Sequence, residues 1–220
     1  MRSFSVAVVR MAAQLLVLSL VVWAVVACDA LWLNLLWLVF LSVVSAFFVV
    51  RRLKLPYAHF LLPVSGGLLV GGLSVGLYLL LMALPWKGGM EARWFVPVMA
   101  LLVGHSATMV VRGLSTYLSA LQADRQQYEF LRGNGANHLR ALLPFVRQAL
   151  QAMIAPTVAN LSVTGLFTMP LLLCGVLLGG LPPLEAFLLT VLLIVGCLAS
   201  QTVSLIVTLW LCDRGKADVT

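Results

Sequence analysis

Residues 31–50 read LWLNLLWLVFLSVVSAFFVV and are followed directly by Arg51 and Arg52. The run contains no charged side chain, and about 20 apolar residues are needed for a helix to cross the hydrocarbon core of a bilayer. No water is present in that core to satisfy backbone N–H and C=O groups. The run is therefore predicted to be a membrane-spanning α-helix that ends at the two arginines.

Five further apolar blocks of similar length surround this one. Hydrophobic residues make up 62% of the 220 residues and charged residues only 10%, whereas a soluble domain has about 25% charged residues. This composition excludes a soluble enzyme, a nucleic-acid-binding domain and a disordered chain. We predict an all-α polytopic membrane protein that forms a single domain over residues 1–220, with spans at 6–27, 31–50, 59–84, 93–121, 152–179 and 184–212.

The distribution of charge predicts the orientation of these spans. If the polar stretch 122–147 is cytoplasmic, that side of the membrane collects eleven Lys and Arg residues, and the other side only Lys87 and Arg93. An excess of Lys and Arg marks the cytoplasmic side of a membrane protein. Both termini are therefore predicted to be cytoplasmic, and Arg112 alone is left inside a span.

The first 28 residues allow a second interpretation. Two arginines, an apolar run and Val25-Val26-Ala27-Cys28 are also typical of a bacterial lipoprotein signal, which would be removed from the mature protein. The other three cysteines, Cys174, Cys197 and Cys212, form no C-x-x-C pair. We expect all four cysteines to be buried free thiols.

The polar stretch 122–147 has internal organisation. Residues 126–132 can form a short helix, Gly133-Asn134-Gly135 would end it, and Asn137 can cap a second helix. An apolar stripe is predicted on that second helix, made of Leu139, Leu142, Leu143 and Val146. The aromatic residues of the first helix favour a docking element for another protein, and the alternative is an amphipathic segment on the membrane surface.

Pairs of glycines recur at helical spacing. Gly67 with Gly71 and Gly72 with Gly76 lie in the third block, and Gly175 with Gly179 lies in the fifth. Small residues four apart allow helix backbones to approach closely, here within one chain or between two chains. We expect packing within one chain.

The second half of the chain resembles a family of transporter subunits. Glu129 followed six residues later by Gly135 is similar to the E-A-A-x-x-x-G loop of ABC-transporter permeases. The chain resembles in particular the permeases of bacterial Fet-type iron exporters and their plant aluminium-resistance relatives. The residues that carry this resemblance are Arg10, Gln14-Leu15, Arg51, Val96-Pro97, Gly104, Glu129, Gly135-Ala136, Arg147, Pro156, Gly165-Leu166, Met169-Pro170, Gly175, Gly179-Gly180 and Pro183-Leu184-Glu185-Ala186.

The chain also departs from the family pattern. Where the family has Gly-Met-Met after a proline, followed later by Gln, this chain has Leu171-Leu172-Leu173 and Val176. His105 stands where the family has Asn, and Leu189-Thr190 where it has Tyr-Gln. These changes replace polar and soft groups by hydrocarbon. They argue against a metal ion as substrate more than against a permease.

The resemblance implies a transport subunit in the bacterial inner membrane that is not itself an enzyme. The chain contains no G-x-x-x-x-G-K-[ST] motif, so ATP and Mg²⁺ are expected in a separate ATP-binding subunit, with no cofactor on this chain. Two permeases and two ATPases are expected, together with membrane lipids and without nucleic acid. The residues expected to contact the ATPase are Tyr128, Glu129, Phe130, Arg132, Gly135 and Arg140.

Polar side chains within the spans are candidates for the transport pathway, because such groups are costly at membrane depth. His105, Met109 and Arg112 share one face of the fourth block, with Thr116 and Ser119. The other candidates are Asn160, Thr164, Thr168, Met169 and Cys174. Hydrogen bonding between helices is the alternative role, and no spacing specifies a metal site.

Two other classes of protein stay open. An ion-coupled secondary carrier would need carboxylates inside the membrane, and none of the seven Asp and Glu residues lies deep in a block. A membrane scaffold without transport would use 122–147 for docking alone. Within the permease class, an amphiphilic organic substrate is the alternative to a metal ion.

Overall fold

The computed structural model describes residues 30–83, 91–135, 138–167 and 169–217, together with residues 9, 12, 16, 19, 22 and 23; within these ranges, residues 31, 83, 93, 160–167, 169–173 and 215–217 are described by their backbone alone. The described part of the chain is helical throughout and contains no strand, as predicted. Its main helices are α2 (Leu31–Leu53), α3 (Tyr57–Ala83), α4 (Ala92–Ala123), α5 (Arg125–Gly133), α6 (His138–Phe167), α7 (Met169–Leu178) and α8 (Pro183–Ala217).

Four of these helices are long and apolar enough to cross a membrane. The qualifying segments are Trp32–Leu53, Tyr57–Met82, Trp94–Ala123 and Pro183–Arg214. They correspond to the predicted spans at 31–50, 59–84, 93–121 and 184–212. The chain is therefore a polytopic membrane protein by the length and composition of its helices.

The other two predicted spans stay predictions. Most of 6–27 lies outside the described residues. The span at 152–179 falls on parts of α6 and α7, whose bounds at Phe167 and Met169 flank Thr168, which lies outside the described residues. At its other end, α6 already starts at His138, so the polar residues up to 147 and the apolar residues after 152 belong to the same helix.

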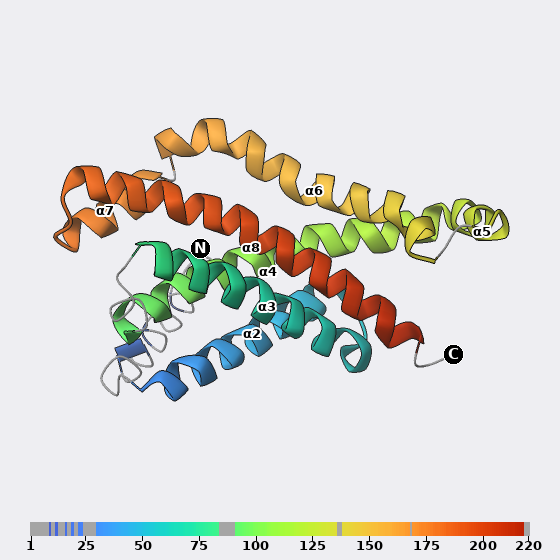
Figure 1. Cartoon of the computed structure of the whole chain (residues 1–220), viewed down its shortest axis with the longest axis horizontal. Coiled ribbons are helices and arrows are strands. Elements are labelled where there is room, and N and C mark those ends of the chain that lie inside the picture. Colours follow the sequence, from blue (N-terminus) through green and yellow to red (C-terminus); the bar gives the residue numbers. More distant parts are fainter. Residues whose placement is uncertain are drawn as a thin grey trace.

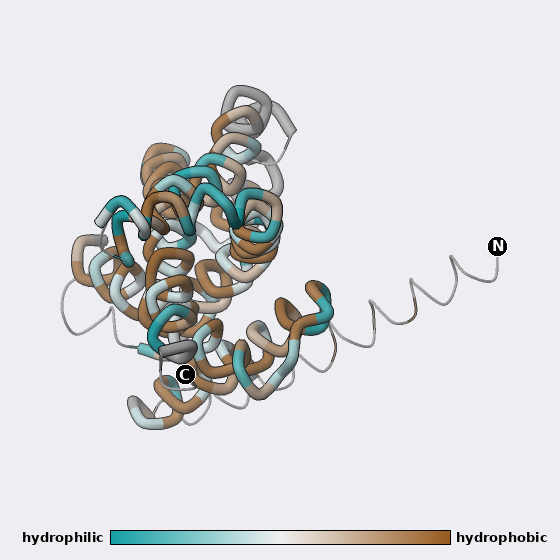
Figure 2. The backbone as a smooth tube through the Cα atoms, turned by 90° about the vertical axis from the view of Figure 1, so that its right-hand side faces the viewer, coloured by the Kyte–Doolittle hydropathy of each residue, from teal (hydrophilic) through white to brown (hydrophobic). Residues whose placement is uncertain are grey.

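The connections place the basic residues at one end of the bundle. The α2–α3 junction, α5 with the start of α6, and the C-terminal part of α8 lie at the right of Figure 1, and α7 lies at the left. Figure 2 looks onto the right-hand end, where many of the hydrophilic segments gather. We call it the basic end, defined by Arg51, Arg52, Lys54, Arg125, Arg132, Arg140 and Arg214.

Helices α3 and α8 touch through glycine. A Cβ atom added at Gly67 would lie 2.7 Å from the backbone oxygen of Ser204, and one added at Gly71 would lie 2.9 Å from that of Ser200. The other face of α3 meets α4, where Gly72 lies against Val103 and Gly76 against Met99. Packing of these two pairs within one chain is thus confirmed. Around Gly175, by contrast, no described atom lies within 4 Å of the Cβ position.

Buried polar side chains accompany this contact. The hydroxyls of Ser106 on α4 and Ser200 on α8 are 3.0 Å apart, and both residues are fully buried. Thr208 donates to the carbonyl of Ser204 one turn earlier. Lipid tails are as apolar as core side chains, so close backbone contact and hydrogen bonds hold membrane helices together where the hydrophobic effect cannot.

Candidate functional site

Helix α5 projects from the basic end and has no buried residue. Helix α4 ends at Ala123, and Asp124 lies between the two helices. After α5 the chain turns through Gly135, whose φ of 81° is favourable only for glycine. The predicted short helix and glycine turn are therefore present, but the second helix of the predicted unit is the first part of the long α6.

Most of the predicted docking residues are exposed. Phe130 is 68% exposed, and Arg132, Gly135 and Arg140 are exposed as well. The Nε atom of Arg125 donates to Glu129 at 3.1 Å on the outer surface. A pair this exposed contributes little to stability. Tyr128 differs from the rest of the set, since it is half-buried and faces the bundle.

The predicted apolar stripe at the start of α6 is only partly buried. Leu142 is buried, but Leu139 and Leu143 are 63% and 65% exposed. The face of α6 that packs against the core carries Leu142, Phe145 and Ala149, with Val146 beside it. The apolar residues of a helix show which of its faces can be buried. The rotation of α6 relative to α4 decides which of these faces is buried.

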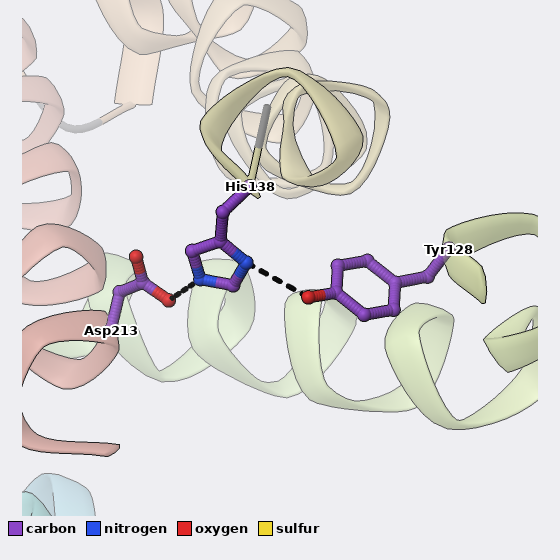
Figure 3. A network of polar contacts seen from close by, with 3 residues as sticks. All are labelled: Tyr128, His138 and Asp213. Carbon is purple, nitrogen blue, oxygen red and sulfur yellow. Dashed lines mark hydrogen bonds and ion pairs between the residues drawn. The ribbon is translucent and has the colours of Figure 1, made fainter. Parts of the chain in front are cut away.

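Three polar residues connect α5, α6 and α8 at the basic end (Figure 3). The Oη atom of Tyr128 lies 2.8 Å from Nδ1 of His138, and Nε2 of His138 lies 2.6 Å from Oδ1 of Asp213. An ionised carboxylate can only accept, so Nε2 of His138 donates to Asp213, while the tyrosine hydroxyl and Nδ1 share the second hydrogen bond. We call these residues the Tyr–His–Asp network.

Neither His138 nor Asp213 was predicted as a site residue. The two are separated by 75 positions along the chain; His138 is the first residue of α6, and Asp213 lies within α8, near its C-terminal end. No local pattern in the sequence brings them together. Only the polar character of Asp213, immediately after a long span, set it apart.

A cavity of about 360 Å³ adjoins the Tyr–His–Asp network. It lies between α3, α4, α5, α6 and α8, and its wall is mainly apolar. Ligand cavities in proteins are typically 300–1,000 Å³ with a few polar groups in an apolar wall. The lining residues are Phe60, Leu114, Tyr117, Leu118, Leu121, Gln122, Arg125, Tyr128, His138, Leu142, Cys212 and Asp213.

The predicted pathway residues of α4 do not converge on one point. His105 pairs through Nε2 with Oε1 of Gln201 on α8 at 3.1 Å, whereas the sulfur of Met109 accepts from Thr157 on α6 at 3.8 Å. Arg112 is exposed and makes no ion pair within the described part of the chain. The first two contacts fit the alternative role, hydrogen bonding between helices.

The remaining pathway candidates give less information. The side chains of Asn160, Thr164 and Met169, and the whole of Thr168, lie outside the described residues. Cys174 is an exposed free thiol on α7, against the expectation of burial, while Cys197 is half-buried and Cys212 is buried. Among the described residues, no group of three His, Cys, Asp or Glu side chains could hold a metal ion.

Long apolar helices, glycine contacts between them and a polar projection at one end define a polytopic membrane protein. The chain belongs to the family described as "Uncharacterised protein family (UPF0014)", which matches residues 1–215. No solved structure matches the chain significantly.

Relatives of this chain occur in plants and bacteria. "Protein ALUMINUM SENSITIVE 3" of Arabidopsis thaliana is 25% identical over 82% of this chain, and "UPF0014 membrane protein STAR2" of Oryza sativa subsp. japonica is 26% identical over 84%. The matches span 64% and 63% of these two relatives, so the chain covers less than two thirds of their length. "UPF0014 membrane protein YjkA" of Bacillus subtilis is 21% identical, over 92% of this chain and 79% of the relative.

Proposed function

We propose that the chain is the membrane-spanning permease subunit of an ABC-type transporter, and that a separate ATP-binding subunit docks on α5 and the start of α6. The observation that carries this proposal is helix α5, which has no buried residue and lies between two long helices at the basic end. Helices α4 and α6 both continue from α5 into the bundle. A force applied to α5 would therefore reach the membrane-embedded helices directly.

Charge supports the orientation that docking requires. The basic end would face the cytoplasm by the positive-inside rule, which is the side where ATP is available. The outer surface of α5 presents an exposed phenylalanine among charged residues, a composition that favours a protein partner. Two copies of the chain with two ATPases would complete the transporter in the bacterial inner membrane.

The resemblance to Fet-type permeases and the name of the Arabidopsis relative, which refers to aluminium sensitivity, support a metal ion as the exported substrate. The residues Leu171, Leu172 and Val176, and the apolar cavity at the basic end, support an amphiphilic organic molecule instead. Cellular iron, manganese and zinc should be compared between a deletion strain and its parent. Raised metal in the deletion strain supports a metal substrate, and unchanged metal supports an organic one.

Docking on α5 predicts that surface changes there will release the ATPase. The double variant Glu129→Ala with Phe130→Ala removes two exposed side chains and no core contact, so the chain should fold normally. Truncating a hot-spot residue of an interface costs about 2 kcal/mol or more of binding free energy. Co-purification of the ATPase whose gene lies nearest to the gene for this chain should therefore fall at least tenfold. His59→Ala, an exposed change on α3 at the same end, is the control. Full retention of the ATPase by the double variant would contradict docking on α5.

The turn after α5 gives a second prediction. Gly135→Ala places a side chain into open space but at a φ of 81°, which costs about 1–2 kcal/mol for an L-residue. Relieving that strain reorients α5, and substrate-stimulated ATP hydrolysis by the reconstituted pair should fall. Gly133→Ala is the matched control, because it meets equally open space within the helix. Equal activity of the two variants would show that the direction of α5 is unimportant.

An ion-coupled carrier is less well supported. In the described parts of the four candidate spans, the acidic residues Glu185 and Asp213 lie near the ends of α8, and none lies at mid-depth. A carrier would transport without any ATPase. Transport by the purified chain alone would favour it over the permease.

A further inference from the structure

The cavity beside the Tyr–His–Asp network has two unlike walls. One is formed by Phe60, Leu114, Leu118, Leu121 and Leu142, contributed by α3, α4 and α6. Protein interiors leave few voids larger than a water molecule, and an apolar void holds water poorly. A cavity of about 360 Å³ is large enough for an apolar group of ligand size.

The other wall is polar and aromatic. Asp213 stands at this side with the rings of Tyr117 and Tyr128, and its side chain is 21% exposed. His138 donates a hydrogen bond to the carboxylate through Nε2. A carboxylate beside aromatic faces is an arrangement that attracts cations.

The one Lys or Arg among the lining residues is paired on another side. Arg125 also lines the cavity, but its side chain is 81% exposed and its Nε atom donates to Glu129 on the outer surface. This pair is neutral overall. Asp213 is the one acidic residue among the lining residues, and no Lys or Arg of the described chain forms an ion pair with it.

We propose that this cavity binds an organic monocation with an apolar body, placing the body against the leucine wall and the charge beside Asp213 and the two tyrosine rings. The cavity lies at the basic end, where an amphiphilic cation would arrive from the adjoining membrane leaflet or from the cytosol. That the bound cation is the transported substrate rests on the function proposed above. Binding itself does not depend on that function.

The test is binding to the full-length chain in lipid nanodiscs without any ATPase, with empty nanodiscs subtracted. Tetraphenylphosphonium is the cationic probe, and tetraphenylborate is an anion of the same shape. The cation should bind at least about tenfold more tightly than the anion, since a nearby carboxylate favours one and opposes the other. Equal affinities would overturn the proposal.

Two variants locate the site. Asp213→Asn keeps an oxygen that can accept from His138 and removes the charge, so cation affinity should fall about tenfold and the preference over the anion should disappear. Leu118→Trp fills the apolar side and should weaken both probes. Glu185→Gln, an exposed acidic residue at the opposite end, is the control and should bind like the parent.

The outcomes separate this proposal from the transporter proposal. Cation preference unchanged in Asp213→Asn, or binding unchanged in Leu118→Trp, would overturn the cavity as the site. If Asp213→Asn fails to fold, Leu118→Trp decides alone. Loss of the ATPase partner with retained cation binding would reject the transporter and keep the binding site. Retention of the ATPase partner together with loss of cation binding would reject the binding site and keep the transporter proposal.

Discussion

Replacing Gly67 and Gly71 together by alanine will push α8 away from α3 and strongly destabilise the bundle. The added Cβ atoms would lie 2.7–2.9 Å from backbone atoms of Ser200, Ser204 and Thr208. Backbone atoms cannot rotate aside as side chains do, so the helices must separate. Overpacking costs about 1–3 kcal/mol per site, a large share of the roughly 5–15 kcal/mol that stabilises a typical protein. Unfolding of the detergent-solubilised chain, followed by SDS titration, measures the loss.

The matched control for this prediction is Gly104→Ala. Gly104 lies within α4, and no described atom lies within 4 Å of its Cβ position. Alanine favours a helix over glycine by up to about 1 kcal/mol, so this variant should equal or exceed the parent in stability. If the double variant at Gly67 and Gly71 were as stable as Gly104→Ala, the backbones of α3 and α8 would not be in close contact at these two glycines.

Replacing His138 by leucine will disconnect α5 from α8 and, in the proposed transporter, reduce ATP-driven transport. The substitution removes both hydrogen bonds of the Tyr–His–Asp network, to Tyr128 and to Asp213. The side chains of His138 and Asp213 are 41% and 21% exposed, so solvent screening limits the loss of stability to about 1 kcal/mol. Coupling between sites is typically 5–150-fold, and we expect about a tenfold fall in substrate-stimulated ATP hydrolysis by the reconstituted pair.

Two comparisons separate coupling from folding. Tyr128→Phe removes one of the two hydrogen bonds and keeps the ring, so its effect should be smaller than that of His138→Leu. The same His-to-Leu change at His59, which is exposed at the basic end, should leave activity unchanged. The His138 variant should still co-purify with the ATPase. Wild-type activity in that variant would mean that the network transmits no movement.

Properties that depend on short segments could be predicted from the sequence. The four described spans needed only length and apolar composition, since the bilayer imposes both. The glycine faces of α3 also needed only their spacing, because residues four apart share one side of a helix. The position of the α5 helix and its turn depended on Gly133 and Gly135 in the same local way.

Properties that depend on how helices are rotated against one another could not be predicted. The α4 candidates His105, Met109 and Arg112 have the spacing of one helix face. In the structure His105 contacts α8, Met109 contacts α6 and Arg112 is exposed. Burial along the apolar stripe of α6 depends on the same rotation, which buries Leu142 and leaves Leu139 and Leu143 exposed.

The sequence by itself determined that this protein has several helices long and apolar enough to cross a membrane, because length and hydropathy are properties of a single span. Only the tertiary structure decided that Asp213 lies beside His138 and that an apolar cavity opens next to them. Such contacts depend on the rotation and sliding of whole helices. Those are set by all the side chains of an interface together, so no local run of residues encodes them.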